Sequence, residues 1–103
     1  MIPGRYILTE TAAADLDEIW EYIAEDNQDA ADRVFAELLA ECARIGSDPG
    51  IGHAREDLVA GRPMKFWRLY KYLIIYRTDR APTEILAIVH GARDVESLLK
   101  DRS

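Results

Sequence analysis

The spacing of the apolar residues changes halfway along this chain, and no other feature of the sequence constrains the fold as strongly. Before residue 46 the apolar residues recur every three or four positions, which is the spacing of helices that bury one face. After residue 63 they form short runs rich in β-branched and aromatic residues, which are typical of strands. The segment between them, 47–63, is rich in glycine and proline and follows no sustained period, so we expect a loop there.

The first half of the chain predicts two consecutive helices. The first begins after Thr9 or Thr11, since either residue can supply an N-cap hydroxyl, and it ends at the polar segment "EDNQD". The second begins near Asn27 or Gln28 and ends at Gly46, with a proline just beyond. Because only a few residues separate the two helices, we expect them to form an antiparallel hairpin.

Four strands are expected around these helices. One short strand, over 5–9, precedes the helices. Three strands follow the loop, over 64–70, 71–78 and 83–90, and the turn "DRAP" separates the last two. Such close spacing favours an antiparallel meander.

The predicted order is therefore β-α-α-β-β-β, an α+β fold in which the helical hairpin packs on one face of a small antiparallel sheet. Residues 94–102 are compatible with a short closing helix capped by Asp94. A chain of 103 residues is long enough for one hydrophobic core and too short for two. We expect residues 1–103 to form a single domain.

Charge is distributed unevenly along the chain. Residues 1–54 contain three Lys/Arg and twelve Asp/Glu, whereas residues 55–103 contain ten and seven. The net charge of −6 argues against indiscriminate binding to nucleic-acid phosphates. Within 62–80 the basic residues face only one acid, Asp79, and they are Arg62, Lys65, Arg68, Lys71, Arg77 and Arg80.

The stretch "KFWRLYKYLIIYR" (65–77) mixes aromatic and basic residues. Strand alternation places apolar and basic side chains on both of its faces, whereas a strand with one buried face would separate them more cleanly. We therefore expect part of this surface to contact a partner. A plain solvated edge and a platform that stacks RNA bases are the alternatives.

No residue pattern predicts a metal site, a reactive thiol or a nucleotide site. Cys42 lies on the apolar face of the second helix, and no basic residue is placed to activate it, so we expect a buried side chain. His53 and His90 are the two histidines, and neither belongs to a known metal-ligand spacing. The glycines of 48–55 follow a helix rather than a strand and lack the G-K-[ST] ending of a phosphate-binding loop. We expect no cofactor.

The sequence also contains no feature of export or membrane insertion. The N-terminal residues do not resemble a signal peptide, and the apolar runs reach only about five residues against the ~20 that span a bilayer. One cysteine cannot form an internal disulfide. We expect a cytoplasmic protein with no membrane partner.

The segment "VHGARD" (89–94) places a histidine, an arginine and a carboxylate at the end of the most apolar run. Each residue has a simple structural interpretation except one. His90 ends the strand, Gly91 permits a turn and Asp94 can cap the closing helix. Arg93 is left as the residue expected to touch a target.

Several motifs, occurring together and in order from about Tyr6 to Asp94, resemble the ParE toxins of type II toxin–antitoxin modules, within the RelE/ParE superfamily. These motifs are "DLDEIWEYIAEDN", "PGIGHAREDL", "YLIIYR" and "EILAIVHGARD". The resemblance implies a helical hairpin packed on a small antiparallel sheet. It also implies a toxin that inhibits DNA gyrase by protein–protein binding, without catalysis, and that a ParD-like antitoxin neutralises. Operator DNA would be contacted only indirectly, through the antitoxin.

The other branch of the superfamily cleaves mRNA on the ribosome and is the alternative function. Metal-independent RNA cleavage needs a general base and cationic groups that stabilise the developing charge. The RelE-like ribonucleases carry an arginine where this chain has Leu73, and an acid–base residue where its tail reads "VESLLKDRS". Only Arg93 matches a cationic position of the superfamily, so we expect no ribonuclease activity. A second alternative is an inactive toxin that acts only as a co-repressor with its antitoxin.

Two sets of contact residues follow from the charge pattern and the resemblance. For gyrase we expect His90 and Arg93 to matter. For the antitoxin, whose acidic residues would pair with the basic stretch, the expected contacts are Arg62, Lys65, Trp67, Arg68 and Arg77.

Overall fold

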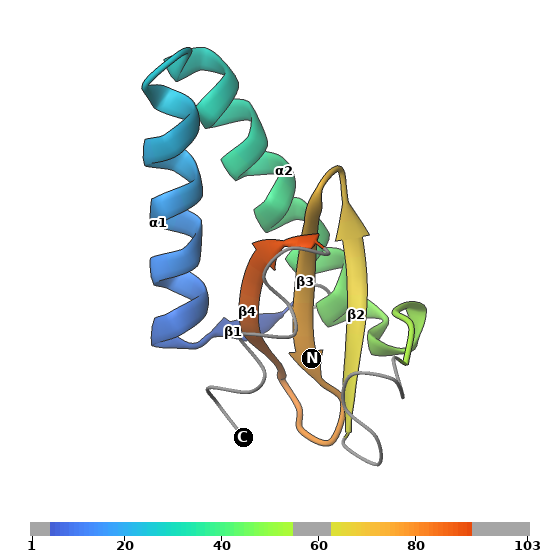
Figure 1. Cartoon of the computed structure of the whole chain (residues 1–103). Helices are drawn as coiled ribbons and strands as arrows, with labels where there is room; N and C mark the ends of the chain where they lie inside the picture. The colour runs from blue at the N-terminus through green and yellow to red at the C-terminus, as the bar shows by residue number, and fades with distance from the viewer. Residues whose placement is uncertain (1–4, 55–62, 92–103) are drawn as a thin grey trace.

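A computed structural model describes residues 5–54 and 63–91 of the chain (Figure 1). Its elements, in chain order, are β1 (Tyr6–Leu8), α1 (Glu10–Ala24), α2 (Gln28–Ser47), the short 3-10 helix η1 (Pro49–Ile51), β2 (Met64–Leu69), β3 (Tyr72–Arg77) and β4 (Thr83–His90). This order confirms the predicted α+β fold. The closing helix expected over 94–102, with its cap Asp94, lies outside the described residues.

The four strands form one sheet in the order β1-β4-β3-β2. The predicted meander is confirmed, because β2 pairs with β3 and β3 with β4 in antiparallel fashion. The edge strand β1 instead pairs with β4 in parallel, with Ile7 opposite Glu84, so the sheet is mixed rather than wholly antiparallel. Two helices separate β1 from the meander, and therefore no tight turn imposes an antiparallel partner on it.

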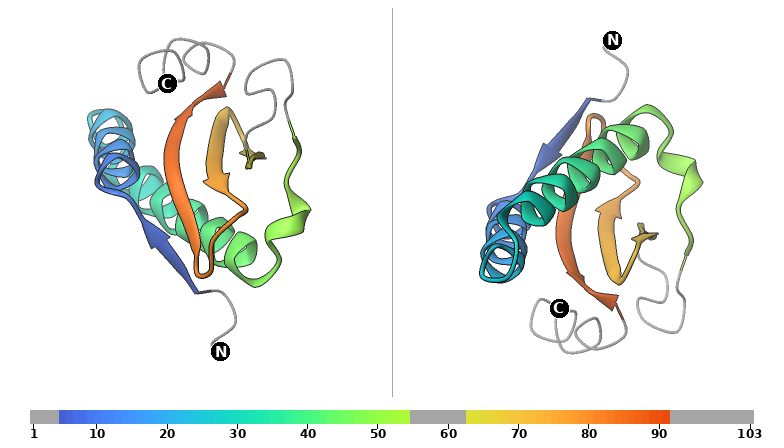
Figure 2. Two further views of the ribbon diagram at one scale, coloured as in Figure 1. Left: turned by 90° about the horizontal axis from the view of Figure 1, so that it is seen from below. Right: turned by 90° about the horizontal axis from the view of Figure 1, so that it is seen from above.

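Both helices lie on one side of the sheet (Figure 2). Of the two candidate caps for α1, the structure uses Thr9, whose hydroxyl accepts the Ala12 N–H at 3.1 Å. Asn27 caps α2 in the same way, and α2 continues through Gly46 to Ser47, slightly beyond the predicted end. No left-handed backbone is needed at Gly46, since the helix closes with the Asp48 N–H donating to the Arg44 carbonyl.

Helix α1 also satisfies the edge of β4 that β1 is too short to cover. The Thr9 N–H donates to the Ile85 carbonyl at 3.1 Å, and the Thr9 hydroxyl donates to the Leu86 carbonyl at 3.0 Å. Further along β4, the Asp15 carboxylate accepts the Ile88 N–H at 3.0 Å. The two polar side chains therefore join the start of α1 to the sheet where the parallel ladder ends.

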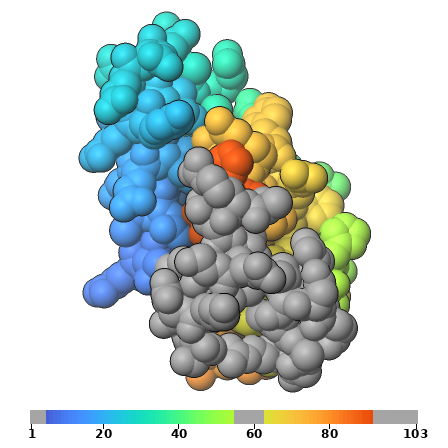
Figure 3. Space-filling model, in the orientation of Figure 1, coloured from blue at the N-terminus to red at the C-terminus, as the bar shows by residue number. Residues whose placement is uncertain are grey.

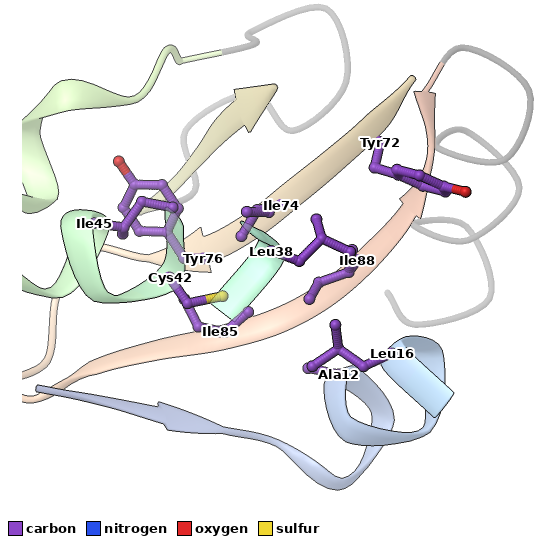
Figure 4. Close-up of a cluster of buried hydrophobic side chains, with 10 residues drawn as sticks. All are labelled: Ala12, Leu16, Leu38, Cys42, Ile45, Tyr72, Ile74, Tyr76, Ile85 and Ile88. Atoms are coloured by element: carbon purple, nitrogen blue, oxygen red, sulfur yellow. The ribbon is translucent and has the colours of Figure 1, made fainter. Parts of the chain in front are cut away.

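The main core lies between the helices and the sheet (Figure 4). Its buried members are Ala12, Leu16, Leu38, Cys42, Ile45, Tyr72, Ile74, Tyr76, Ile85 and Ile88. A second buried cluster, formed only by strand residues, consists of Phe66, Ile75, Ala87 and Val89. Apolar side chains therefore occupy both faces of the sheet.

A register shift in β4 places two consecutive residues, Leu86 and Ala87, beside the second cluster. Ile75 pairs with Ala87 but Tyr76 pairs with Ile85, so Leu86 is an extra residue that interrupts the alternation. After this bulge, Ile88 returns to the helix side, and Val89 joins the second cluster.

The Tyr76 hydroxyl holds the loop after α2 against the sheet. It donates to the Pro49 carbonyl at 2.6 Å and accepts the Gly52 N–H at 2.9 Å. Next to it, His53 and Phe66 exchange two backbone hydrogen bonds of 2.8 Å, which attach the loop to the outer edge of β2.

Replacing Thr9 tests the joint between α1 and β4. We expect Thr9→Ala to lower the free energy of unfolding by about 1–3 kcal/mol, because it removes both the cap and the hydrogen bond to Leu86. Urea denaturation of the two variants Thr9→Ala and Thr9→Ser measures this, since serine keeps the hydroxyl. Equal stability of the two variants would show that the hydroxyl of residue 9 does not stabilise the contact between α1 and β4.

Two glycines of the loop after α2 provide a matched comparison. A Cβ at Gly52 would overlap the Tyr76 hydroxyl, whereas the nearest atom to a Cβ at Gly50 is an oxygen of Asp48 at 3.5 Å, an ordinary contact. We expect Gly52→Ala to destabilise the protein by about 1–3 kcal/mol through overpacking. Gly50→Ala should unfold close to the wild-type urea midpoint, and similar losses in both variants would contradict this packing argument.

Candidate interaction surfaces

The end of β4, where "VHGARD" begins, is attached to the turn between β2 and β3. His90 pairs with Tyr72 across the strands, and the two rings meet edge to face with centroids 6.4 Å apart. The Gly91 N–H donates to the Lys71 carbonyl at 2.7 Å. A Cβ at Gly91 would lie 3.1 Å from the same carbonyl oxygen, so a close backbone approach favours glycine here.

His90, one of the two residues expected to contact gyrase, has a buried Nδ1 without a hydrogen-bond partner in the described part of the chain. Its ring lies on the helix side of the sheet, beside Tyr72. The second expected residue, Arg93, lies outside the described residues.

The turn that follows β2 contains a residue that the sequence analysis did not single out. Tyr70 has a φ of 56°, in the left-handed region that bulky residues rarely adopt. Leu69 and Tyr72 pair on either side of it, so Tyr70 and Lys71 form a two-residue turn. Only the first of them has a positive φ, a pattern for which glycine is the favoured residue.

Tyr70 is also 63% exposed. Its hydroxyl donates a hydrogen bond to the Glu37 carboxylate of α2, which raises the pKa of Tyr70 above its usual value. The sequence signal for this turn is weak, because neither Tyr70 nor Lys71 is a residue type that usually forms turns.

The residues expected to bind the antitoxin do not form one patch. Arg68 is exposed near the end of β2, and a nitrogen of its guanidinium is 3.7 Å from the Cβ position of Gly91. Arg77 lies at the opposite end of the sheet, paired with Met64. Arg62 lies outside the described residues.

Arg77 already has a partner within the chain. Its Nε and one terminal nitrogen donate to the two carboxylate oxygens of Asp79 at 2.9 and 2.7 Å. These hydrogen bonds lower the pKa of Asp79 and raise that of Arg77. The pair therefore presents little net charge to a partner.

Trp67 and Lys65 are engaged with the loop and α2. The Trp67 indole N–H donates to the Glu41 carboxylate at 3.1 Å, the His53 ring stacks on the indole at 6.2 Å, and the Arg44 guanidinium lies 5.5 Å from the ring centre. Lys65 donates to the Gly52 carbonyl at 3.5 Å. Trp67 is partly buried against the main core, so its ring contributes to the fold as well as to the surface.

The structure supports the interpretation of Cys42 as a buried side chain. Burial, and after it the charge of Glu41, raises the pKa of the Cys42 thiol to about 12, which suppresses the thiolate. Among the described residues there is no group of three or more His, Cys, Asp or Glu side chains that could hold a metal ion. Nor does any helix within the described residues have the length and apolar character needed to cross a membrane.

Leu73 lies on the sheet face that points away from the helices. It pairs with Arg68 on one side and Val89 on the other. This cross-strand row contains one cation and two apolar side chains.

Comparison with known proteins agrees with this architecture. A solved structure described as the chromosomal ParDE TA system from P. aeruginosa matches with a TM-score of 0.70 and 20% sequence identity, covering 84% of this chain and 94% of that chain. At this identity the match shows that the fold is shared. No curated protein sequence matches the chain significantly.

A protein-family model identifies the family of the chain. The model of the ParE toxin of the type II toxin–antitoxin system parDE matches residues 6–95, a span that includes every described helix and strand. The chain therefore belongs to the ParE toxin family of type II toxin–antitoxin systems.

Proposed function

We propose that this ParE-type toxin inhibits DNA gyrase by protein–protein binding and that a ParD-like antitoxin neutralises it in a tight complex. Membership of the ParE family is the observation that carries the proposal. Gyrase acts on DNA in the cytoplasm, so the toxin would act there. Operator DNA would be reached only through the antitoxin.

The row around Leu73 supports inhibition by binding rather than RNA cleavage. Cleavage without a metal would require a general base and several cations around the scissile phosphate. In this row Arg68 is accompanied by Leu73 and Val89, which can neither transfer a proton nor stabilise a negative charge.

The solved structure of similar fold is described as a ParDE system, and this description supports an antitoxin as the partner. In our proposal, acidic antitoxin residues pair with Lys65 and Arg68 on β2. Arg77 contributes less, since Asp79 already neutralises it. Trp67 offers the exposed part of its ring as an apolar contact.

A supercoiling assay with purified gyrase tests the proposed target. We expect the toxin to block supercoiling or to trap cleaved DNA, while translation in a cell-free extract continues unchanged. Blocked translation with active gyrase would instead establish the ribonuclease alternative. Absence of both effects, together with normal growth of cells that express the toxin, would favour the co-repressor alternative.

The antitoxin contact can be tested with variants that remove charge but keep a polar side chain. We expect Arg68→Gln to weaken antitoxin binding about three- to tenfold and to flatten its salt dependence, as for a charge at an interface rim. The double variant Arg77→Gln/Asp79→Asn removes one charge of each sign and should bind like the wild type. Calorimetric titration at two salt concentrations measures both. An unchanged Kd for Arg68→Gln would remove Arg68 from the interface.

A further inference from the structure

Tyr70 occupies a position where the backbone disfavours tyrosine. Its φ of 56° brings the Cβ of an L-residue close to its own carbonyl, and glycine would avoid this strain. Strained residues persist where the surrounding structure holds them, and they are concentrated at functional sites. A function of the side chain would explain why tyrosine rather than glycine occupies this position.

Packing inside the protein does not explain the side chain. Tyr70 is 63% exposed, and it belongs to neither buried cluster of the sheet. Its polar contact is one hydrogen bond to Glu37 at the surface, where water competes for both groups. A large aromatic ring that is exposed on a strained turn is better explained by contact with a partner, because tyrosine is enriched at the centres of protein interfaces.

The surroundings of Tyr70 indicate the chemistry of that partner. Lys71 is the next residue, and its ammonium lies 5.8 Å from the Tyr72 ring. The Arg33 guanidinium of α2 is close enough to Tyr70 to lower its pKa, against the larger effect of Glu37. Neither cation forms an ion pair with a residue in 5–54 or 63–91. Together with the Glu37 carboxylate, these two cations leave one net positive charge around Tyr70, so a complementary surface would offer an apolar recess with carboxylates at its rim.

A second exposed tyrosine belongs to the same end of the molecule. Tyr22 of α1 is 70% exposed. The pKa of Tyr72 is raised first by burial of Tyr72 and second by the electrostatic effect of Tyr22, so the two side chains are neighbours. Figure 1 and Figure 3 show the connection between α1 and α2 toward the same end of the molecule as the β2–β3 turn. The Gly91–Lys71 hydrogen bond attaches this turn to the strand end that carries His90.

We infer that Tyr70 anchors the contact with gyrase, and that the surface extends from His90 across the β2–β3 turn with Lys71 and Arg33 beside the tyrosine. This inference rests on the proposed function. It adds an anchoring residue and the character of the gyrase patch, which is an apolar recess flanked by acidic residues.

The strain at Tyr70 makes a test possible in which loss of function does not come from loss of folding. Tyr70→Gly removes the ring and relieves the backbone, so we expect its thermal midpoint to be equal to or above that of the wild type. The concentration that half-inhibits purified gyrase should rise more than about tenfold, as for removal of an anchoring tyrosine. Tyr70→Phe restores the ring without the Glu37 hydrogen bond and should recover most of the potency.

Ile7→Thr supplies the control for loss of an exposed apolar side chain. Ile7 is 48% exposed on β1, which pairs with the opposite end of β4, and threonine is also a β-branched residue. We expect its potency to be unchanged.

The outcomes separate the inference from the proposed function. Failure of the wild type to affect gyrase would refute the proposed function. Inhibition by the wild type and equally by Tyr70→Gly would refute only the role of Tyr70. A midpoint of Tyr70→Gly below the wild type would show that the tyrosine stabilises the turn, which also overturns the inference. If Tyr70→Gly lost antitoxin binding but still inhibited gyrase, the inference would also be overturned, because the surface would then bind the antitoxin.

Discussion

The hydrogen bonds between the start of α1 and the edge of β4 are the constraint on which the rest of the structure depends. β1 has only three residues, so the parallel ladder ends at Ile85, and the backbone groups beyond need other partners. Thr9 and Asp15 supply them at Leu86 and Ile88. These contacts fix the helical hairpin against the central strand, and the main core and the position of Tyr22 beside Tyr72 follow from that orientation.

The sequence predicted helices and strands well because apolar spacing is a local property. The starts of both helices, to within two residues, and all three meander strands were read from neighbouring residues. The parallel pairing of β1 and the extra residue Leu86 were not, since both depend on contacts between distant segments. The two buried clusters, one on each face of the sheet, explain why apolar residues appeared on both faces of "KFWRLYKYLIIYR". Phe66 belongs to the second cluster, whereas Trp67 and Leu69 pack on the helix side.

The candidate surfaces were less predictable because a charge count does not reveal partners. Arg77 appeared equivalent to Arg68, yet Asp79 occupies its guanidinium and Arg68 remains exposed. Trp67 appeared available, but Glu41, far away in the sequence, accepts its N–H. Tyr70 was accessible to sequence reasoning in principle, since a two-residue turn without glycine, asparagine or aspartate is unusual. The alternating residues around it drew attention to the strands instead of the turn.

The strain at Tyr70 persists because the turn is held from three directions. Leu69 and Tyr72 pair at its base, Glu37 of α2 accepts the tyrosine hydroxyl, and the Lys71 carbonyl accepts the Gly91 N–H. The last bond also attaches the end of β4 to the turn, so the turn and residues 89–91 are held together. A partner that binds this end of the sheet therefore meets a prearranged surface, which reduces the entropy lost on binding. The close approach at Gly91 thus supports recognition by positioning its neighbours rather than by contributing a reactive group.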